Sequence, residues 1–532
     1  MHPILIKLQD VVIKTRKIFP FAQIYRLIYL FLTYFFSRLI ALNRSVICVY
    51  LDKKDKKDLV CGSSDIDYII VTKNDIDYYQ AYKIFNFIYL TKKFIPIFGA
   101  HMILKKSEFI NALKMGIDVK YIKKEILFKR KEFSLPDISL SYDNFKNWPF
   151  FFFNGLSHIY YDVLKIKTIN MVRQFCSLII KFFKSHSLEN IIISKYDFCK
   201  KILEKADPDN PQIKTICNYY LLSSRGVKIQ FNDKAIKDLT SAYVMSLNLL
   251  QKYLEPDLSK SEKRIEFELA LTKSVYEHVS EPYIFDDISP QIIDFCKKQN
   301  GTIKSAVLAS APCTDFGYFV YFILNENLND LEYLEIISAA KNITIFSKLT
   351  HLRKCGMFNL PKILKSNSLN YINTFHDPLC IPIEYYYLKR HGKIIYGENV
   401  IENLIEPDKK FLIENILRFA SYLPIKTRRM FVNTRPISHL ISLLYCTLPS
   451  TKLLLEHGII TTTAKETFVE YIEHYGKEAD WLRKTHENYI NNTNPQKIKI
   501  SEGTTEEWYK ITEKILDDIR SKTSELLKDV KI

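Results

Sequence analysis

The stretch "CGSSDIDYIIV", residues 61–71, places two aspartates directly before an uninterrupted apolar run. Asp65 and Asp67 are two residues apart, so their side chains point to the same side of an extended backbone. Like charges this close repel each other, and burying them is costly unless a cation or a basic group compensates. The stretch therefore predicts either a metal site at the mouth of a buried strand or a loop whose acids face water.

The sequence around this stretch predicts an α+β fold with a small mixed sheet. Residues 1–43 predict a helix, and residues 74–94 predict a second one that Asn74 or Asp75 would cap. Apolar runs rich in β-branched residues predict three strands, at 45–51, 67–71 and 101–105. The order of strand, loop, strand, helix and strand favours a sheet with flanking helices.

The pattern "SVICVYL…SSDIDYIIV" resembles the core of the polymerase-β-like nucleotidyltransferase superfamily, over about residues 40–125. Members have a strand, a loop with Gly-Ser that opens a helix, and a second strand that starts with Asp-x-Asp. A third carboxylate comes from a later strand. The resemblance implies a nucleotidyltransferase-type sheet and a Mg²⁺-dependent transferase with Asp65 and Asp67 as catalytic metal ligands. Carboxylate oxygens suit Mg²⁺, and two such ions can stabilise both the entering and the leaving oxygen.

The implied reaction moves a nucleoside monophosphate from a nucleoside triphosphate (NTP) to a hydroxyl group and releases pyrophosphate. The acceptor is left open between a sugar, another small molecule, a protein and RNA, with a slight preference for a sugar. In the family, Gly-Ser lies several residues before Asp-x-Asp, where this chain reads "DKKDKKD" (52–58). Glycine and serine let the backbone approach phosphates closely, whereas lysines act as point charges. The candidate nucleotide-binding residues are Gly62, Ser63, Ser64, Lys53 and Lys54.

The third carboxylate has no clear counterpart in this sequence. A family-like acid is expected near residues 100–102, yet residues 99–106 contain none. Glu108 and Asp118 are the nearest acids, and both lie outside the predicted strand. A catalytically inactive scaffold or binding protein with the same fold is therefore the first alternative function.

The sequence predicts that the order of elements recurs in the second half of the chain. Strands are predicted at 303–310, 318–327 and 344–349, with a helix at 330–343. The places of Asp65 and Asp67 then fall near Gly317 and Phe319, so this copy would lack the acids. Residues 382–400 resemble the Gly-x-hydrophobic-hydrophobic-Tyr-Gly turn of antibiotic-type and related bacterial nucleotidyltransferases. We expect a degenerate second module that is not catalytic.

Four regions are predicted along the chain. A nucleotidyltransferase-like core with an N-terminal helix covers 1–130, and a helical domain covers 131–295. The degenerate module covers 296–430 and a C-terminal helical region covers 431–532. Thr504 and Glu507 have the spacing of a capping box for the final helix.

The composition favours anionic partners. The net charge is +17, from 76 Lys and Arg against 59 Asp and Glu. Nucleotides, nucleic acid and anionic membranes all suit such a charge, although lysines spread over ordinary solvated faces are the favoured explanation. An RNA- or membrane-surface-associated basic protein is therefore the second alternative function. Nucleic acid is not specifically indicated.

The cysteines and the N-terminal apolar run bear on localisation. The ten cysteines contain no CxxC pair, which argues against a zinc ribbon or a disulfide framework and favours a reducing cytoplasm. In residues 24–42, Arg26 and Arg38 bracket eleven uncharged residues, fewer than the roughly 18 that span a bilayer. This run predicts an amphipathic or buried core helix, with a peripheral membrane role as the alternative and no transmembrane segment.

Three further features have ordinary structural interpretations. His101 in the third predicted strand is expected to be a satisfied core or edge histidine, with the active-site position as the alternative. His391 beside Gly392 is expected in a turn. The basic residues at 426–430 are expected on a solvated face, with phosphate contact as the alternative.

Overall fold

The computed structural model divides the chain into two compact units. The first unit is Met1–Ser246, Ser421–Arg435 and Leu527–Ile532, and the second is Leu247–Ala420 and Pro436–Leu526. The described residues are 11–12, 14–15, 18–51, 61, 65–95, 97–99, 101–115, 126–134, 169–184, 193–204, 211–224, 235, 237–239, 241–242, 268–273, 282–299, 301–310, 318–324, 352–359, 384–402, 409–432, 443–484 and 502–528. Each unit contains a mixed four-stranded sheet among these residues.

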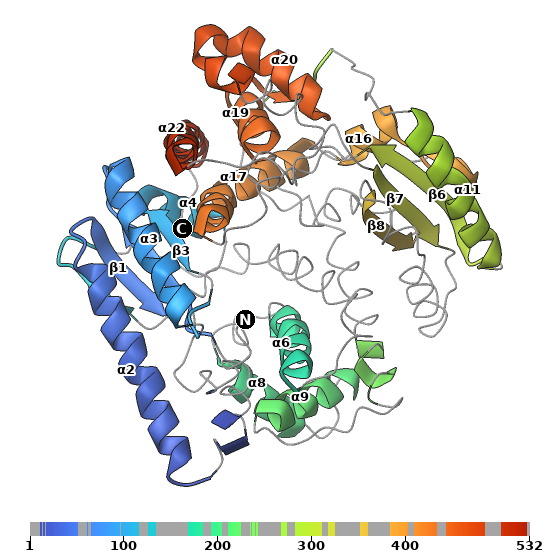
Figure 1. Ribbon diagram of the computed structural model, residues 1–532. Coiled ribbons are helices and arrows are strands. Elements are labelled where there is room, and N and C mark those ends of the chain that lie inside the picture. Colours follow the sequence, from blue (N-terminus) through green and yellow to red (C-terminus); the bar gives the residue numbers. More distant parts are fainter. Residues whose placement is uncertain are drawn as a thin grey trace. The chain divides into compact units, whose positions relative to one another are not determined.

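The first sheet has the strand order β3-β2-β1-β4, and its strands β1 and β3 are labelled in Figure 1. β2 runs antiparallel to β1 and parallel to β3, and β4 runs antiparallel to β1. The strands are β1 (Val46–Leu51), β2 (Tyr68–Thr72), β3 (Met102–Lys105) and β4 (Ile126–Lys129). The predicted small mixed sheet in an α+β fold is confirmed, and the short strand β4 is an addition to it.

Helix α2 (Phe21–Ala41) precedes β1, α3 (Tyr78–Phe94) lies between β2 and β3, and α4 (Lys106–Lys114) lies between β3 and β4. The predicted caps of α3 were wrong, because the N-cap is Asp77, whose Oδ1 accepts from the Gln80 N–H at 2.7 Å. Asn74 instead accepts from the Ser107 N–H at 2.9 Å and so ties the loop after β2 to the start of α4.

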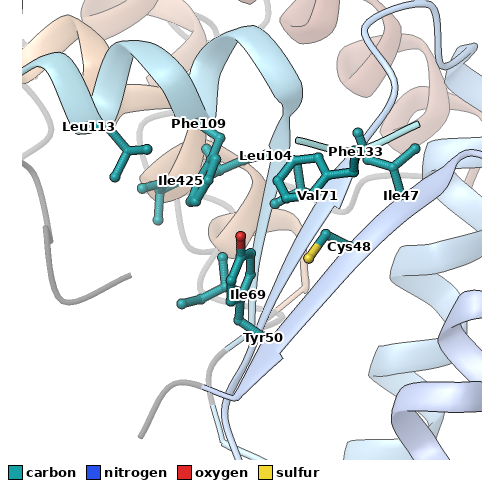
Figure 2. Close-up of a cluster of buried hydrophobic side chains, with 10 residues drawn as sticks. All are labelled: Ile47, Cys48, Tyr50, Ile69, Val71, Leu104, Phe109, Leu113, Phe133 and Ile425. Carbon is teal, nitrogen blue, oxygen red and sulfur yellow. The ribbon is translucent and has the colours of Figure 1, made fainter. Parts of the chain in front are cut away.

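The core of the first unit lies on the sheet (Figure 2). All residues of β1 and β2 are buried, as expected for strands that are covered on both faces. The Tyr50 ring stacks on Phe109 of α4 at a centroid distance of 5.7 Å. Ile425 joins this cluster from α17 (Lys409–Val432), whose residues from Ser421 onward belong to the first unit.

A group of helices completes the described part of the first unit: α6 (Ile169–Lys184), α8 (Lys195–Glu204) and α9 (Pro211–Ser224). Each contributes one buried cysteine, namely Cys176, Cys199 and Cys217. Burial raises the pKa of the Cys176 and Cys199 thiols, so these side chains are protonated and behave as small apolar groups.

The second sheet has the strand order β8-β7-β6-β9 and repeats the directions of the first. β7 is antiparallel to β6 and parallel to β8, and β9 is antiparallel to β6. The strands are β6 (Ile303–Ser310), β7 (Tyr318–Leu324), β8 (Leu352–Asn359) and β9 (Lys393–Gly397). The strand predicted at 303–310 is confirmed, and the one predicted at 318–327 is confirmed over 318–324. Residues 325–327 and the helix and strand predicted at 330–349 lie outside the described residues.

The two sheets also share their irregularities. The pairing of the first two strands shifts between Val46 and Cys48 in one sheet and between Ile303 and Ser305 in the other. The pairing with the fourth strand shifts between Val49 and Tyr50 in the first sheet. In the second sheet the corresponding pairing shifts between Ala306 and Val307, which are the residues of β6 that match Val49 and Tyr50 of β1. Val46 of β1 thus occupies the place that Ile303 occupies in β6.

The described residues of the second unit outside this sheet form helices and a small parallel sheet of β5 (Ala270–Leu271) and β10 (Ile459–Ile460). α11 (Pro282–Lys298) precedes β6 as α2 precedes β1, and the connections 299–302 and 42–45 have equal length. The other helices described here are α16 (Glu384–His391), α19 (Leu448–His457), α20 (Ala464–Tyr475) and α22 (Glu502–Leu526). Thr504 and Glu507 lie inside α22, so the predicted capping box does not start this helix.

Candidate functional site at the start of β2

Asp65 and Asp67 lie at the start of the central strand β2, on either side of a residue that pairs with the neighbouring chain segment. Ile66 forms a parallel bridge with Phe98. The Ile66 N–H donates to the Ile97 carbonyl at 2.8 Å, and the Gly99 N–H donates to the Ile66 carbonyl at 3.1 Å. This extended pairing holds the backbone of the two acids in place before β2 begins.

The surroundings of Gly99 show that the side chains of Asp65 and Asp67 lie on the same side of the backbone. A Cβ atom at residue 99 would lie 2.0 Å from Oδ1 of Asp67 and 2.7 Å from Cβ of Asp65. Asp65 is exposed and Asp67 is half-buried, while Ile66 and Tyr68 are buried. The structure therefore brings the two predicted metal ligands together, beside a position that only glycine fits without displacing them.

His101 fills an irregularity between β2 and β3. Ile66 pairs with Phe98 and Ile69 pairs with Met102, so the segment that leads into β3 has one residue more than the facing segment that leads into β2. At this bulge, the Tyr68 N–H donates to Nδ1 of His101 at 3.0 Å, and the two rings stack at 5.1 Å. His101 thus supplies the acceptor that the ladder lacks. The prediction of a satisfied core histidine is confirmed.

Tyr68 fastens helix α2 to the same end of the sheet. Its hydroxyl donates to the Thr33 carbonyl at 2.8 Å, and Phe36 of α2 packs on Phe98 at a ring-centroid distance of 4.7 Å. Burial raises the pKa of Tyr68 well above its usual value, so the hydroxyl stays protonated and acts as a donor. The backbone behind the two acids is therefore held from two directions.

Glu108 does not join Asp65 and Asp67. It is buried at the start of α4, where its carboxylate receives two hydrogen bonds from Arg428, at 2.5 and 2.8 Å. Arg428 also donates to the Ile103 carbonyl at 3.1 Å. The prediction of a solvated face at 426–430 was wrong for Arg428, because this guanidinium compensates a buried carboxylate that lies far away in the sequence.

The donor set that can be described at this site is the pair of aspartates. Among the described residues, no group of three or more His, Cys, Asp or Glu side chains is arranged to hold a metal ion. Asp118 lies outside the described residues, as do the candidate nucleotide-binding residues Gly62, Ser63, Ser64, Lys53 and Lys54.

The second sheet has different residues at the matching positions. Tyr68 pairs with Leu51, and Val320 pairs with Leu308, the matching residue of β6. Counting back from these pairs puts Phe319 at the place of Asp67 and Gly317 at the place of Asp65. Gly317 lies outside the described residues, and the register agrees with the two positions expected from the sequence.

A buried polar cluster in the second unit was missed by the sequence analysis. Thr463 is the N-cap of α20 and forms a capping box with Glu466. The Glu466 carboxylate also accepts hydrogen bonds from the Thr462 N–H at 2.6 Å and from the Thr462 hydroxyl at 2.7 Å. Arg390 lies 3.3 Å from Glu466, and Nε2 of His391 lies 3.7 Å from the same oxygen. The spacing of Thr463 and Glu466 is a capping-box signal that would have located the end of this cluster.

His391 belongs to that cluster rather than to a turn. It is the last residue of α16, its side chain is largely buried, and Nε2 lies 3.0 Å from the Thr462 hydroxyl. Burial by itself raises the pKa of Glu466, but hydrogen bonds from His391 and Thr462 and the charge of Arg390 outweigh it, so the pKa is lowered. The cluster is an internally satisfied structural network.

Comparison with protein-family models, with curated proteins and with solved structures finds no match for this chain.

Proposed function

We propose that the first unit is a metal-dependent nucleotidyltransferase of the polymerase-β-like class. It would move a nucleoside monophosphate from an NTP to a hydroxyl acceptor, with a sugar or another small molecule as the favoured acceptor class. The observation that carries this proposal is the placement of Asp65 and Asp67 together against Gly99, at the start of a buried strand. The mixed sheet around that strand has the element order of the class.

The chemistry of the donor set fits a divalent cation of the Mg²⁺ type. Mg²⁺ prefers oxygen ligands and commonly binds through one or two carboxylates together with substrate phosphates, which is what Asp65 and Asp67 offer. When bound, the ion would stabilise the negative charge that builds on the α-phosphate. The acceptor oxygen forms a bond to the α-phosphorus, the bond to pyrophosphate breaks, and the hydroxyl proton passes to water or a nearby base.

The residues around the two acids would hold them in position. The pairing of Ile66 with Phe98 and the bond from Tyr68 to His101 fix the backbone on both sides of Asp67. A rigid pair of carboxylates needs little reorganisation when a cation and a triphosphate arrive, which favours catalysis over mere binding. Mg²⁺ and the NTP are the proposed cofactor and substrate.

A labelled-nucleotide experiment tests this function. The full chain is incubated with each labelled NTP and Mg²⁺ or Mn²⁺, and pyrophosphate and labelled products are measured. We expect Asp65→Asn and Asp67→Asn to abolish product formation and to weaken Mn²⁺ binding. Asp75→Asn is the matched control, because it removes an exposed carboxylate a few residues beyond the site. Unchanged Mn²⁺ affinity in both site variants would exclude the metal site.

A non-catalytic scaffold is the second candidate, and one observation favours it. The second sheet repeats the topology with Phe319 and Gly317 in place of the acids, so one copy of this arrangement already exists without them. We propose that this second sheet is a degenerate module that serves as a binding surface or scaffold. Mn²⁺ binding without pyrophosphate release from any NTP would extend the scaffold role to the first unit.

A further inference from the structure

The outer face of helix α2 is apolar, although it points away from the sheet that the helix covers. The buried residues Tyr29, Thr33 and Phe36 face the sheet. The exposed large apolar residues recur at spacings of three and four, so they form one stripe along the helix. They are Phe21, Ile24, Leu27, Ile28, Phe31 and Phe35.

The matching helix of the second sheet has a polar outer face along residues 289–298, where its side chains are described. α11 stands in the same place before β6 and buries Ile292, Phe295 and Cys296. Its exposed residues include Gln291, Asp294, Lys297 and Lys298. In α2, by contrast, Leu27 is 66% exposed and Phe31 is 63% exposed. The described part of α11 thus lies next to its sheet without an apolar outer face, and the stripe on α2 needs another explanation.

The charges near the stripe in the sequence indicate what covers it. Residues 11–51 contain six basic residues and no Asp or Glu: Lys14, Arg16, Lys17, Arg26, Arg38 and Arg44. An apolar face next to basic side chains is the pattern of helices that lie in the headgroup region of membranes with anionic lipids. Aromatic residues such as Phe31 and Phe35 suit that region.

The orientation of α2 follows from its contacts with the sheet. α2 is the one helix among the described residues that is long and apolar enough to cross a bilayer. A spanning helix would have to expose its whole circumference to lipid. One side of α2 is instead held by the Tyr68–Thr33 hydrogen bond and by packing of Phe36 on Phe98. Only the outer stripe is available, so the helix would lie along the surface rather than across the bilayer.

We propose that the outer stripe of α2 docks the first unit onto the surface of an anionic lipid bilayer, with the helix parallel to the membrane plane. The proposal concerns a surface away from the two aspartates and is independent of the proposed transferase activity.

Vesicle flotation of the full chain tests the proposal. We expect binding to phosphatidylcholine vesicles that contain phosphatidylglycerol, weaker binding to phosphatidylcholine alone, and a loss of binding at high salt. Leu27→Glu with Phe31→Glu should lower the partition coefficient at least about tenfold, because two apolar side chains no longer enter the interface. The uncharged pair Leu27→Ser with Phe31→Ser should also weaken binding.

The matched control is Gln291→Glu with Lys297→Gln on α11, which changes the net charge by the same amount on the polar counterpart helix. We expect it to bind vesicles like the parent protein. Circular dichroism checks that every variant is folded.

Equal vesicle binding by the parent and both stripe variants would overturn the proposal. The proposal would also be overturned if the parent protein did not bind vesicles but formed a dimer in lipid-free sedimentation that the stripe variants abolished. Retention in membranes after carbonate extraction would overturn the surface orientation in favour of a spanning helix.

Discussion

The two sheets of this protein have the same strand order, the same strand directions and the same two register shifts, but different residues at the start of the central strand. In the first sheet this position carries Asp65 and Asp67, and in the second it carries Gly317 and Phe319. The paired apolar strands fix the topology, and they are alike in both sheets. The proposed chemistry depends on two residues beside the strand, which can change without changing the pairing.

The two units also differ in the residues that compensate a buried carboxylate. The first unit compensates Glu108 with Arg428, which comes from a distant segment. The second unit compensates Glu466 with Arg390, Thr462 and His391. Because each unit depends on its own buried acid, the units can be perturbed separately.

Arg428→Ala is the change with the largest expected effect. It leaves the buried Glu108 carboxylate without its partner, which typically costs about 3–5 kcal/mol. We expect the first unit to lose protection in hydrogen exchange at β1, β2 and β3, while β6 and β7 keep theirs. Replacing both partners, with Glu108→Gln and Arg428→Met, should be milder, because no charge stays buried alone. Equal loss of protection in both sheets would contradict the separation of the units.

Glu466 makes the second unit sensitive to acid. Its pKa in the folded protein is lowered below the ordinary 4.5, so its charge stabilises the fold above that pH. The stabilisation is lost as the pH falls through the lowered pKa. We expect Glu466→Gln to cost about 1.5–3 kcal/mol at neutral pH and progressively less in acid. Hydrogen exchange of α20 at several pH values measures this, with β1 as the internal reference.

His101→Ala should destabilise the first sheet at its bulge. The Tyr68 N–H would be buried without an acceptor, at a cost of about 1–3 kcal/mol. His101→Asn should recover part of this loss, because the Asn side-chain oxygen can accept the same bond. Urea unfolding of the three proteins gives the comparison. If alanine and asparagine have equal effects, packing rather than the hydrogen bond explains the role of His101.

Gly99→Ala has the smallest expected effect on stability and a specific effect on the site. The added methyl group would overlap Oδ1 of Asp67, so we expect a loss of Mn²⁺ affinity of about tenfold or more. Gly301→Ala is the matched control in the second unit, since its methyl group meets no atom within 4 Å and only its positive φ is strained. Calorimetric titration with Mn²⁺ should separate the two variants. Identical affinities would show that the acids do not act as a pair.

The sequence was sufficient for the strands that contain a run of apolar residues. β1, β2 and β7 consist mostly of large apolar residues, and every residue of β1 and β2 is buried. β6 has its apolar run at 306–309, after Lys304 and Ser305. β4 and β9 were missed as strands, since each is short and carries charged residues on the sheet edge. β8 contains Arg353, Lys354 and Gly356, and no strand was predicted within its bounds.

The pair of acids was predictable and their surroundings were not. Asp65 and Asp67 are recognisable from a spacing of two residues before an apolar run. The close approach of Gly99 and the acceptor role of His101 arise from an extra residue between β2 and β3, which no local pattern reveals. The partner of Glu108 lies 320 residues away, a distance over which sequence periodicity carries no information.

The distance between Glu108 and Arg428 also has a consequence for synthesis of the protein. A ribosome that adds about 5–20 residues per second needs roughly 15–60 s to travel from one to the other. During that time the first sheet has emerged while the guanidinium that its buried carboxylate requires has not yet been made. The first unit can therefore reach its final core only late in translation, after most of the second unit has left the ribosome. A premature stop codon directly after residue 420 would remove Arg428 and so damage the N-terminal sheet, although every strand of that sheet had already been synthesised.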